Sequence, residues 1–222
     1  MPRFEGKFLS VVLVGHQNPQ ILNHDFLVKN NILPVDKDPF KTLIDKDAGR
    51  PFDEFVSVPI LATIRYGHVS ITVQEDRYQI LDNRFGSPAD SPIFDITRNY
   101  FQKHLKYTPF TVGGMNLNGI IYFSDLSDEL KFDERLGINR PKFAELLRAD
   151  GIRTGATVAA AHRNGLIEVQ IAKPKDGSPV ALFNLNYEFK YEEIGTFMAN
   201  LDDAEALYHE SQRILLALGV EQ

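Results

Sequence analysis

The residues with the clearest capacity for chemistry are two histidines and an aspartate near the start of the chain. Seven residues separate His16 from His24, and Asp25 follows the second histidine directly. An imidazole paired with a carboxylate can act as a general base with its orienting partner, or bind a metal ion. The spacing matches no defined zinc motif, such as two histidines at i and i+4 of one helix. These residues are therefore either helix-capping and surface residues or part of a catalytic or ligand-binding site.

The other histidines lie where a polar ring is common. His68 and His162 come at the ends of expected strands, just before a turn, and His104 and His209 lie on expected helices. If the two halves of the chain are copies of one unit, His68 and His162 occupy related positions. His162 is kept as a candidate for binding a ligand or a partner.

The segment 108–123, TPFTVGGMNLNGIIYF, is the one around which the other elements are organised. Its apolar residues are dense enough for a sheet interior, and its three glycines allow other backbone or a ligand to approach closely. It lacks the Lys-Ser/Thr ending of a phosphate loop and the spacing of a dinucleotide fingerprint. We predict a central strand whose glycines serve packing. Asn116 and Asn118 share one face of it, where they could bond a partner's exposed edge.

Composition narrows the classes of function. Lys and Arg total 24 against 30 Asp and Glu, a net charge of -6, which disfavours binding to duplex nucleic acid. The absence of cysteine excludes disulfides, thiolate nucleophiles and cysteine-based metal sites, and it fits a reducing cytoplasm. No apolar run approaches the roughly 20 residues that span a bilayer, and no export signal is recognised. We expect a cytoplasmic protein without a cofactor, a bound metal or a membrane partner.

The spacing of apolar residues predicts an α+β fold, with a mainly antiparallel sheet and helices packed on one face. Strands are expected at 8–14, 55–66, 69–74, 77–82, 109–123, 154–162, 166–173 and 179–190. Helices are expected after Asn18-Pro19, at 96–107, from Asn139 with Phe143, Leu146 and Leu147 facing inward, and at 202–218. The mostly charged segment 124–137 is assigned no element.

The whole chain, residues 1–222, is expected to form a single domain, since its length suffices to close one core. Three strands followed by a helix occur twice, over about 55–107 and 154–219. This order suggests a duplicated βββα unit with the central strand between the copies. A coincidence of common motifs explains the same order, and both explanations stay open.

Two polar patterns resemble ligand sites and have simpler structural explanations. The excursion 36–54 contains two Asp-Lys-Asp triplets, but neither has the Gly and the downstream Glu of an EF-hand loop, so a solvated loop is expected. Phe183, Tyr187, Phe189 and Tyr191 alternate with polar residues, as on a strand face that stacks single-stranded bases. The acidic residues beside them oppose phosphate, so we interpret these aromatic side chains as core.

Three motifs occur in one order: Gly15-His16-Gln17-Asn18-Pro19 with Leu22 and Phe26, then Pro109 to Asn116, then Val180 to Phe189 with Asn186-Tyr187-Glu188. In this the chain resembles a group of uncharacterised bacterial proteins of similar length. In that group an early strand leads into an Asn-Pro helix, a middle strand carries a Gly and an Asn, and a late strand carries an Asn before an aromatic residue and a Glu. The resemblance covers most of the chain. It implies no established activity and assigns no catalytic residue.

The functional expectation follows from the lack of a catalytic constellation beside a well-formed α+β pattern. There is no Gly-x-Ser-x-Gly elbow or other recognisable serine motif. We therefore expect a non-enzymatic binding or scaffolding protein that acts through a protein partner or by self-association, at a sheet edge or at the exposed face of the sheet. The alternative is a metal- or nucleotide-dependent enzyme or ligand binder, with a site where His16, His24 and Asp25 approach the glycine-rich strand.

Overall fold

The fold of the chain divides into two compact units. The computed structural model describes residues 1–30, 32, 54–58, 60–84, 86–105, 107–148, 154–162, 165–174, 177–190 and 194–221. One unit, here called the meander unit, comprises Phe8–Met115 and Glu188–Glu205. The other, the hairpin unit, comprises Met1–Lys7, Asn116–Tyr187 and Ala206–Gln222. The predicted excursion at 36–54 lies outside the described residues except for Glu54.

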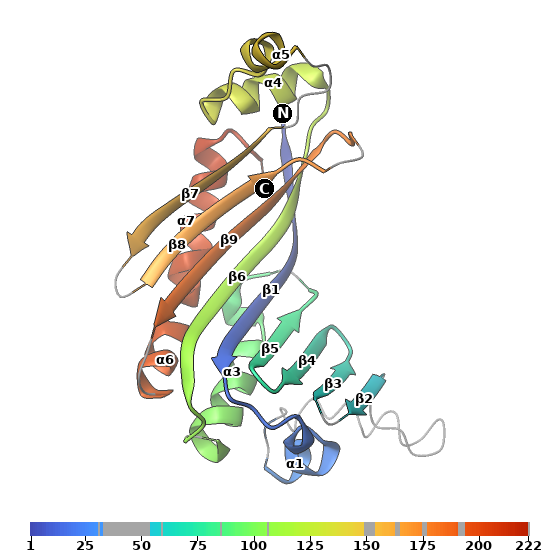
Figure 1. Ribbon diagram of the computed structural model, residues 1–222, viewed down its shortest axis with the longest axis vertical. Coiled ribbons are helices and arrows are strands. Elements are labelled where there is room, and N and C mark those ends of the chain that lie inside the picture. Colours follow the sequence, from blue (N-terminus) through green and yellow to red (C-terminus); the bar gives the residue numbers. More distant parts are fainter. Residues whose placement is uncertain are drawn as a thin grey trace. The chain divides into compact units, whose positions relative to one another are not determined.

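The described residues form a nine-stranded antiparallel sheet, so the protein is α+β as the sequence predicts. The strands are β1 (Arg3–Gly15), β2 (Glu54–Val58), β3 (Leu61–Tyr66), β4 (Val69–Gln74), β5 (Arg77–Asp82), β6 (Phe110–Tyr122), β7 (Gly155–His162), β8 (Gly165–Ala172) and β9 (Val180–Lys190). Their order in the sheet is β2-β3-β4-β5-β1-β6-β9-β8-β7 (Figure 1). The predicted central strand is confirmed as β6, and β1, β6 and β9 each contribute residues to both units.

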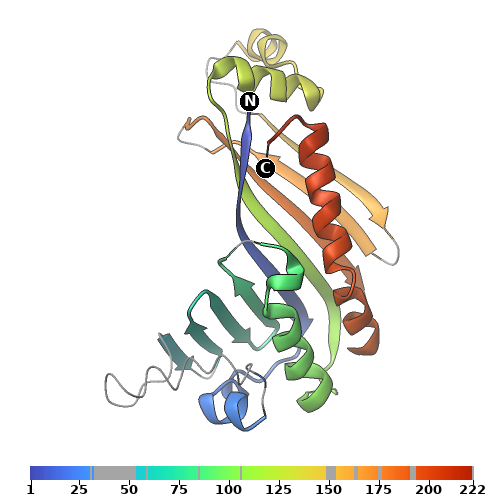
Figure 2. The same ribbon diagram turned by 180° about the vertical axis from the view of Figure 1, so that it is seen from behind.

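Helical segments accompany the strands of both units. They are η1 (Pro19–Ile21), α1 (His24–Lys29), η3 (Pro88–Asp90), α3 (Ile93–Arg98), the π-helical η4 (Asn99–His104), α4 (Leu126–Arg135), α5 (Arg140–Leu147), α6 (Ile194–Leu201) and α7 (Ala204–Ala217). Figure 2 shows α3 lying across β5 in the meander unit, and α7 lying across β8 and β9 in the hairpin unit. Among the described helices, none combines the length and the apolar character needed to cross a membrane.

The core of the meander unit comes from alternating strand residues. Val69, Ile71 and Val73 of β4 are fully buried while the residues between them face the other side, as is typical of a strand with one face in the core. The strand expected at 69–74 is thus confirmed. Against this face pack aromatic rings from β5 and η4: the ring centroids of Tyr78 and Tyr100 lie 5.1 Å apart. The helical segment η4 is thereby held on the sheet by aromatic contacts.

The core of the hairpin unit takes its largest side chains from β9. Phe183, Leu185 and Tyr187 are buried, and so are Leu207 and Leu215 on α7. The interpretation of the β9 aromatic residues as core is therefore confirmed for Phe183, Tyr187 and Phe189, while Tyr191 lies outside the described residues.

Two glycines of β6 allow close packing. A methyl group at Gly113 would lie 2.8 Å from Phe197 and 2.9 Å from Phe189, whose rings stack with centroids 5.6 Å apart. A methyl group at Gly119 would overlap the ring of Phe4 and come within 2.7 Å of the Glu5 carbonyl oxygen. The prediction that glycines of this strand serve packing is confirmed at both positions.

The first meander differs from its prediction. The expected single strand 55–66 is a hairpin of β2 and β3, in which Val58 pairs with Leu61. The residue after Val58 is Pro59, and proline cannot donate a hydrogen bond to a strand ladder. Among the described residues, four strands (β2 to β5) lie between α1 and α3, whereas three (β7 to β9) lie between α5 and α6. The expected order βββα therefore holds only for the second half. Whether the halves are copies stays a prediction.

The predicted helices need three corrections. The segment left unassigned at 124–137 contains α4, whose N-cap Asp125 accepts a hydrogen bond from the Asp128 amide at 2.8 Å. Phe143 and Leu146 of α5, expected to face inward, are 49% and 67% exposed. The expected final helix 202–218 is α7, and α6 precedes it unpredicted. Arg140, the first residue of α5, bonds carboxylates of α4, so ionic contacts contribute to holding this helix.

Candidate functional site

The edge strand β7 has the most accessible pairing surface in the hairpin unit. It pairs with β8 from Gly155↔Ala172 to His162↔Gly165, and among the described residues it has no strand on its other side. Six of its eight residues are exposed, with Val158 at 62%. Its sequence, GATVAAAH, contains no Asp, Glu, Lys or Arg. Natural edge strands are usually shortened, charged or covered, because an open edge pairs with other chains.

The opposite edge of the sheet is shorter. The strand β2 has five residues, Glu54–Val58, and begins with a charged side chain. Its Val56 and Val58 are exposed. Among the described residues, fewer backbone groups are available at β2, so β7 is the stronger candidate for pairing.

A buried ionic cluster holds the open end of the β7–β8 hairpin. Asp133 of α4 is 1% exposed, and its Oδ1 accepts hydrogen bonds from Thr154 Oγ1 at 2.9 Å and from Lys173 Nζ at 2.8 Å. Thr154 directly precedes β7 and Lys173 directly follows β8, so one carboxylate joins both ends of the hairpin. Arg140 Nε donates to the second oxygen of Asp133 at 2.9 Å. Because each buried charge of the cluster has hydrogen-bonding partners, the cluster holds the open end of the β7–β8 hairpin in one conformation.

The second carboxylate of the cluster, Glu129, makes the stability of the protein depend on pH. Burial raises the pKa of Glu129, but the hydrogen bonds from Lys173 and Arg140 together lower it by a larger amount. The pKa of Glu129 therefore lies below its ordinary value of 4.5. A carboxyl group whose pKa is lower in the folded state stabilises the protein above the unfolded pKa and loses this effect as the pH falls through the folded pKa.

We predict that the advantage of the wild type over Glu129→Gln in urea unfolding is largest near pH 7 and shrinks below pH 4.5, where Glu129 becomes protonated. Circular dichroism follows the transition, because the chain has no tryptophan. A difference between the two proteins that stays constant down to about pH 3 would contradict the prediction.

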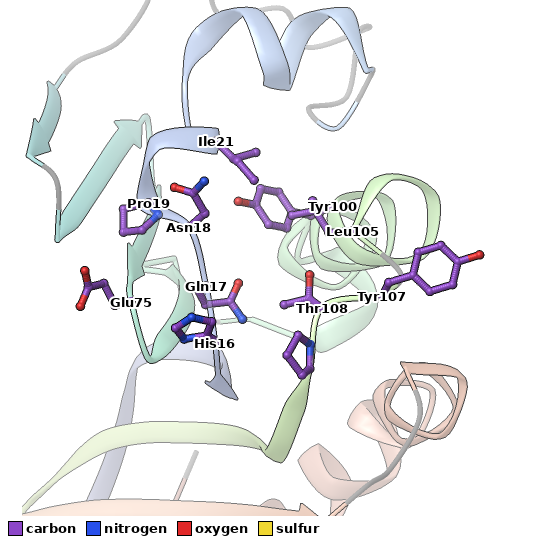
Figure 3. A pocket seen from close by; sticks show the side chains of 11 residues that line it. His16, Gln17, Asn18, Pro19, Ile21, Glu75, Tyr100, Leu105, Tyr107 and Thr108 are labelled. Carbon is purple, nitrogen blue, oxygen red and sulfur yellow. The ribbon is translucent and has the colours of Figure 1, made fainter.

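The meander unit contains a pocket of about 610 Å³ beside His16. It is lined by His16, Gln17, Asn18, Pro19, Ile21, Glu75, Tyr100, Leu105, Tyr107, Thr108 and Pro109 (Figure 3). These residues come from the connection between β1 and η1, from η1 itself, from the turn between β4 and β5, from η4 and from the chain leading into β6. The volume lies in the range of small-molecule sites.

Backbone contacts fix the wall of the pocket. The His16 amide donates to the Pro109 carbonyl at 3.1 Å, and the Gln17 amide donates to the Glu75 carbonyl at 2.7 Å. The Asn18 side chain accepts from the Gln20 amide at 3.0 Å and so caps the helical turn expected after Asn18-Pro19, and Pro19 occupies its first position. The geometry around His16 and Gln17 is thus set before any ligand binds.

The structure distributes the predicted site residues over both units. His16 lines the pocket, whereas His24 and Asp25 lie on α1 and their side chains are outside the described part of the structure. Asn116 and Asn118 are half-buried on β6 in the hairpin unit. His162 ends β7, its ring centroid 5.7 Å from that of Tyr187. Within the described residues, no three His, Asp or Glu side chains are placed to share a metal ion.

Two pocket residues were not predicted from the sequence. Gln17 is 7% exposed, and no hydrogen-bond partner of its Nε2 is present among the described residues. Tyr100 is expected from the sequence only as part of the helix at 96–107; burial raises its pKa well above the ordinary value. The adjacent histidine was the one available signal for Gln17. The π-helical turn that carries Tyr100 is a feature frequent at functional sites, and it is visible only in the structure.

Comparison with known proteins does not add a function to this geometry. No protein-family model, no curated protein and no solved structure matches the chain. The resemblance to bacterial proteins of similar length stays a prediction, and function is inferred from the two sites described above.

Proposed function

We propose that this protein is a binding module that associates with a second copy of itself through antiparallel pairing of two β7 strands. The observation that carries the proposal is an exposed, uncharged edge strand of eight residues. Such a strand offers a row of backbone donors and acceptors, and adding a strand to an open edge is a common mode of recognition.

The sequence of β7 suits a partner strand identical to itself. A two-fold pair centred between Val158 and Ala159 sets each of these residues opposite the other in the second chain. The same register sets Thr157 opposite Ala160. Because β7 contains no Asp, Glu, Lys or Arg, no two like charges lie opposite each other in this register. Like charges directly opposite each other destabilise antiparallel pairs. The small side chains let the two backbones approach without steric conflict.

The ionic cluster supports pairing by ordering the strand in advance. Asp133 joins Thr154 and Lys173 at the open end of the hairpin, so less conformational freedom is lost when a partner strand binds. A surface ordered in this way is expected to bind more tightly than the same strand in a flexible hairpin.

Paired substitutions test both the strand and its register. In the proposed dimer, Val158→Lys with Ala159→Lys sets lysine against lysine and is expected to give a monomer. Val158→Glu with Ala159→Lys sets each glutamate against the partner's lysine and is expected to retain the dimer. Light scattering coupled to size exclusion measures the mass, and Ala206→Lys, on the exposed side of α7, is the control for an added charge.

A wild-type protein that stays monomeric at all accessible concentrations would contradict self-association. A dimer that survives both lysine substitutions would place the interface elsewhere. Loss of the dimer in both double variants would reject the two-fold register.

A further inference from the structure

We infer that the pocket beside His16 is a binding site for an uncharged planar ligand that presents an N–H and a C=O side by side, the edge of a cyclic amide such as a nucleobase. This inference goes beyond self-association, because the pocket lies in the meander unit while β7 belongs to the hairpin unit. It is carried by the geometry of Gln17.

The Gln17 amide is a buried group that lacks a partner. Gln17 is 7% exposed, and its Nε2 has no hydrogen-bond partner among the described residues. A buried donor left without an acceptor costs about 1–3 kcal/mol, so native proteins rarely keep one unless something binds it. Figure 3 shows the amide directed into the space between His16 and Thr108. An acceptor oxygen on a bound molecule would complete its hydrogen bonding.

The amide type specifies the ligand edge. A glutamine side chain offers an NH₂ group as donor beside a C=O acceptor in one plane, the arrangement by which Gln and Asn pair with nucleobase edges. Figure 3 also shows the hydroxyl of Tyr100, a second polar group that lines the pocket, directed toward Asn18. Because burial raises the pKa of Tyr100, this hydroxyl stays protonated and can donate.

The remaining lining residues favour a ligand that is flat, partly apolar and uncharged. Ile21, Leu105 and Pro109 provide apolar surface around the polar groups. None of the described lining residues is Lys or Arg, and Glu75 is acidic, so a phosphate has no cationic partner among them. A free base is therefore favoured over a nucleotide.

The tyrosine that contributes the hydroxyl is held rigidly. The Tyr100 ring is almost fully buried, with centroids of Phe26 at 5.7 Å and Phe101 at 4.8 Å in edge-on contact. Its ring therefore cannot turn away from the pocket without breaking these contacts, which gives the ordered polar group that a specific site requires.

Binding is tested with free bases on the full chain. The probes are uracil, thymine and hypoxanthine, which all carry the cyclic amide edge, with uridine monophosphate to test the effect of a phosphate group. Each is titrated by saturation-transfer NMR of the ligand ring protons. At least one free base is expected to bind with a Kd below about 1 mM, and the monophosphate is expected to bind no more tightly than uracil. Gln17→Leu is expected to weaken binding about tenfold or more. Gln74→Leu, a matched change at an exposed position of β4, is expected to leave binding unchanged.

Thermal unfolding separates this role from a structural one. If the Gln17 amide bonds only to a ligand, Gln17→Leu removes an unsatisfied buried donor from the ligand-free protein. The midpoint of thermal unfolding then stays the same or rises. A lower midpoint would show that the amide has a structural partner and would overturn the inference. Failure of every base to bind, unchanged binding by Gln17→Leu, or tighter binding of the monophosphate would do the same. If Gln17→Leu does not fold, Gln17→Met, with an unbranched apolar side chain, is measured in its place.

Discussion

Replacing Asp133 with asparagine is expected to lower the free energy of unfolding by about 3–5 kcal/mol, the usual cost of removing one member of a buried ion pair. Asp133 is 1% exposed and accepts hydrogen bonds from Thr154, Arg140 and Lys173. Asparagine keeps the shape but loses the charge, which leaves Glu129 as the one carboxylate facing two cations in the cluster. Urea unfolding followed by circular dichroism measures the change.

The matched control for this substitution is Asp95→Asn. Asp95 is 76% exposed and pairs with Arg98, which also bonds Asp202. Exposed pairs contribute little, so a loss of less than about 1 kcal/mol is expected. Equal effects of the two aspartate substitutions would show that Asp133 does not join the hairpin to α4 in the way described. Because the same carboxylate holds both ends of the hairpin, Asp133→Asn is also expected to weaken self-association.

The second large effect is expected at Gly119, where alanine should destabilise the protein by about 1–3 kcal/mol, the range for overpacking a filled core. The added methyl group would overlap the Phe4 ring and lie 2.7 Å from the Glu5 carbonyl oxygen. A ring can shift to relieve strain, but a backbone oxygen of the neighbouring strand moves only if β1 moves. Phe4 also contacts Phe183 edge-on, with centroids 5.6 Å apart, which restricts where its ring can go.

A double-mutant cycle divides this cost between the ring and the backbone. In a Phe4→Leu background, Gly119→Ala is expected to cost less than in the wild type, with a remainder due to the Glu5 carbonyl. Gly86→Ala is the control, because a methyl group there meets no atom within 4 Å. If both glycine substitutions have the same effect, close packing is not the reason for Gly119.

Short-range patterns predicted much of the fold. The spacing of apolar residues predicts the strand β4, the Asn18-Pro19 pair predicts a helical turn, and the glycine-rich segment predicts an interior strand. Each of these signals depends on residues within a few positions of one another. Propensity, capping and the two-residue period of a strand act over that range.

The errors occurred where stability comes from distant partners. The charged residues of α4 gave little apolar periodicity, although the Asp125 cap and the acidic first turn were readable signals. The apolar spacing of Phe143 and Leu146 predicts an inward face, but spacing alone does not ensure burial. In the structure Arg140 joins α5 to the cluster through polar contacts, and those side chains remain exposed.

The amino-acid sequence by itself determined the strands, most helices, the absence of cysteine chemistry and the candidate His16. Only the tertiary structure decided that β7 is an edge, that Asp133 meets Lys173 across 40 positions of the chain, and that Gln17 is buried without a partner. The physical reason is that strand order and side-chain burial depend on contacts between segments far apart in sequence. A local pattern predicts the secondary structure of a segment. Contacts with the surrounding segments determine which backbone and side-chain groups of that segment remain available to bind.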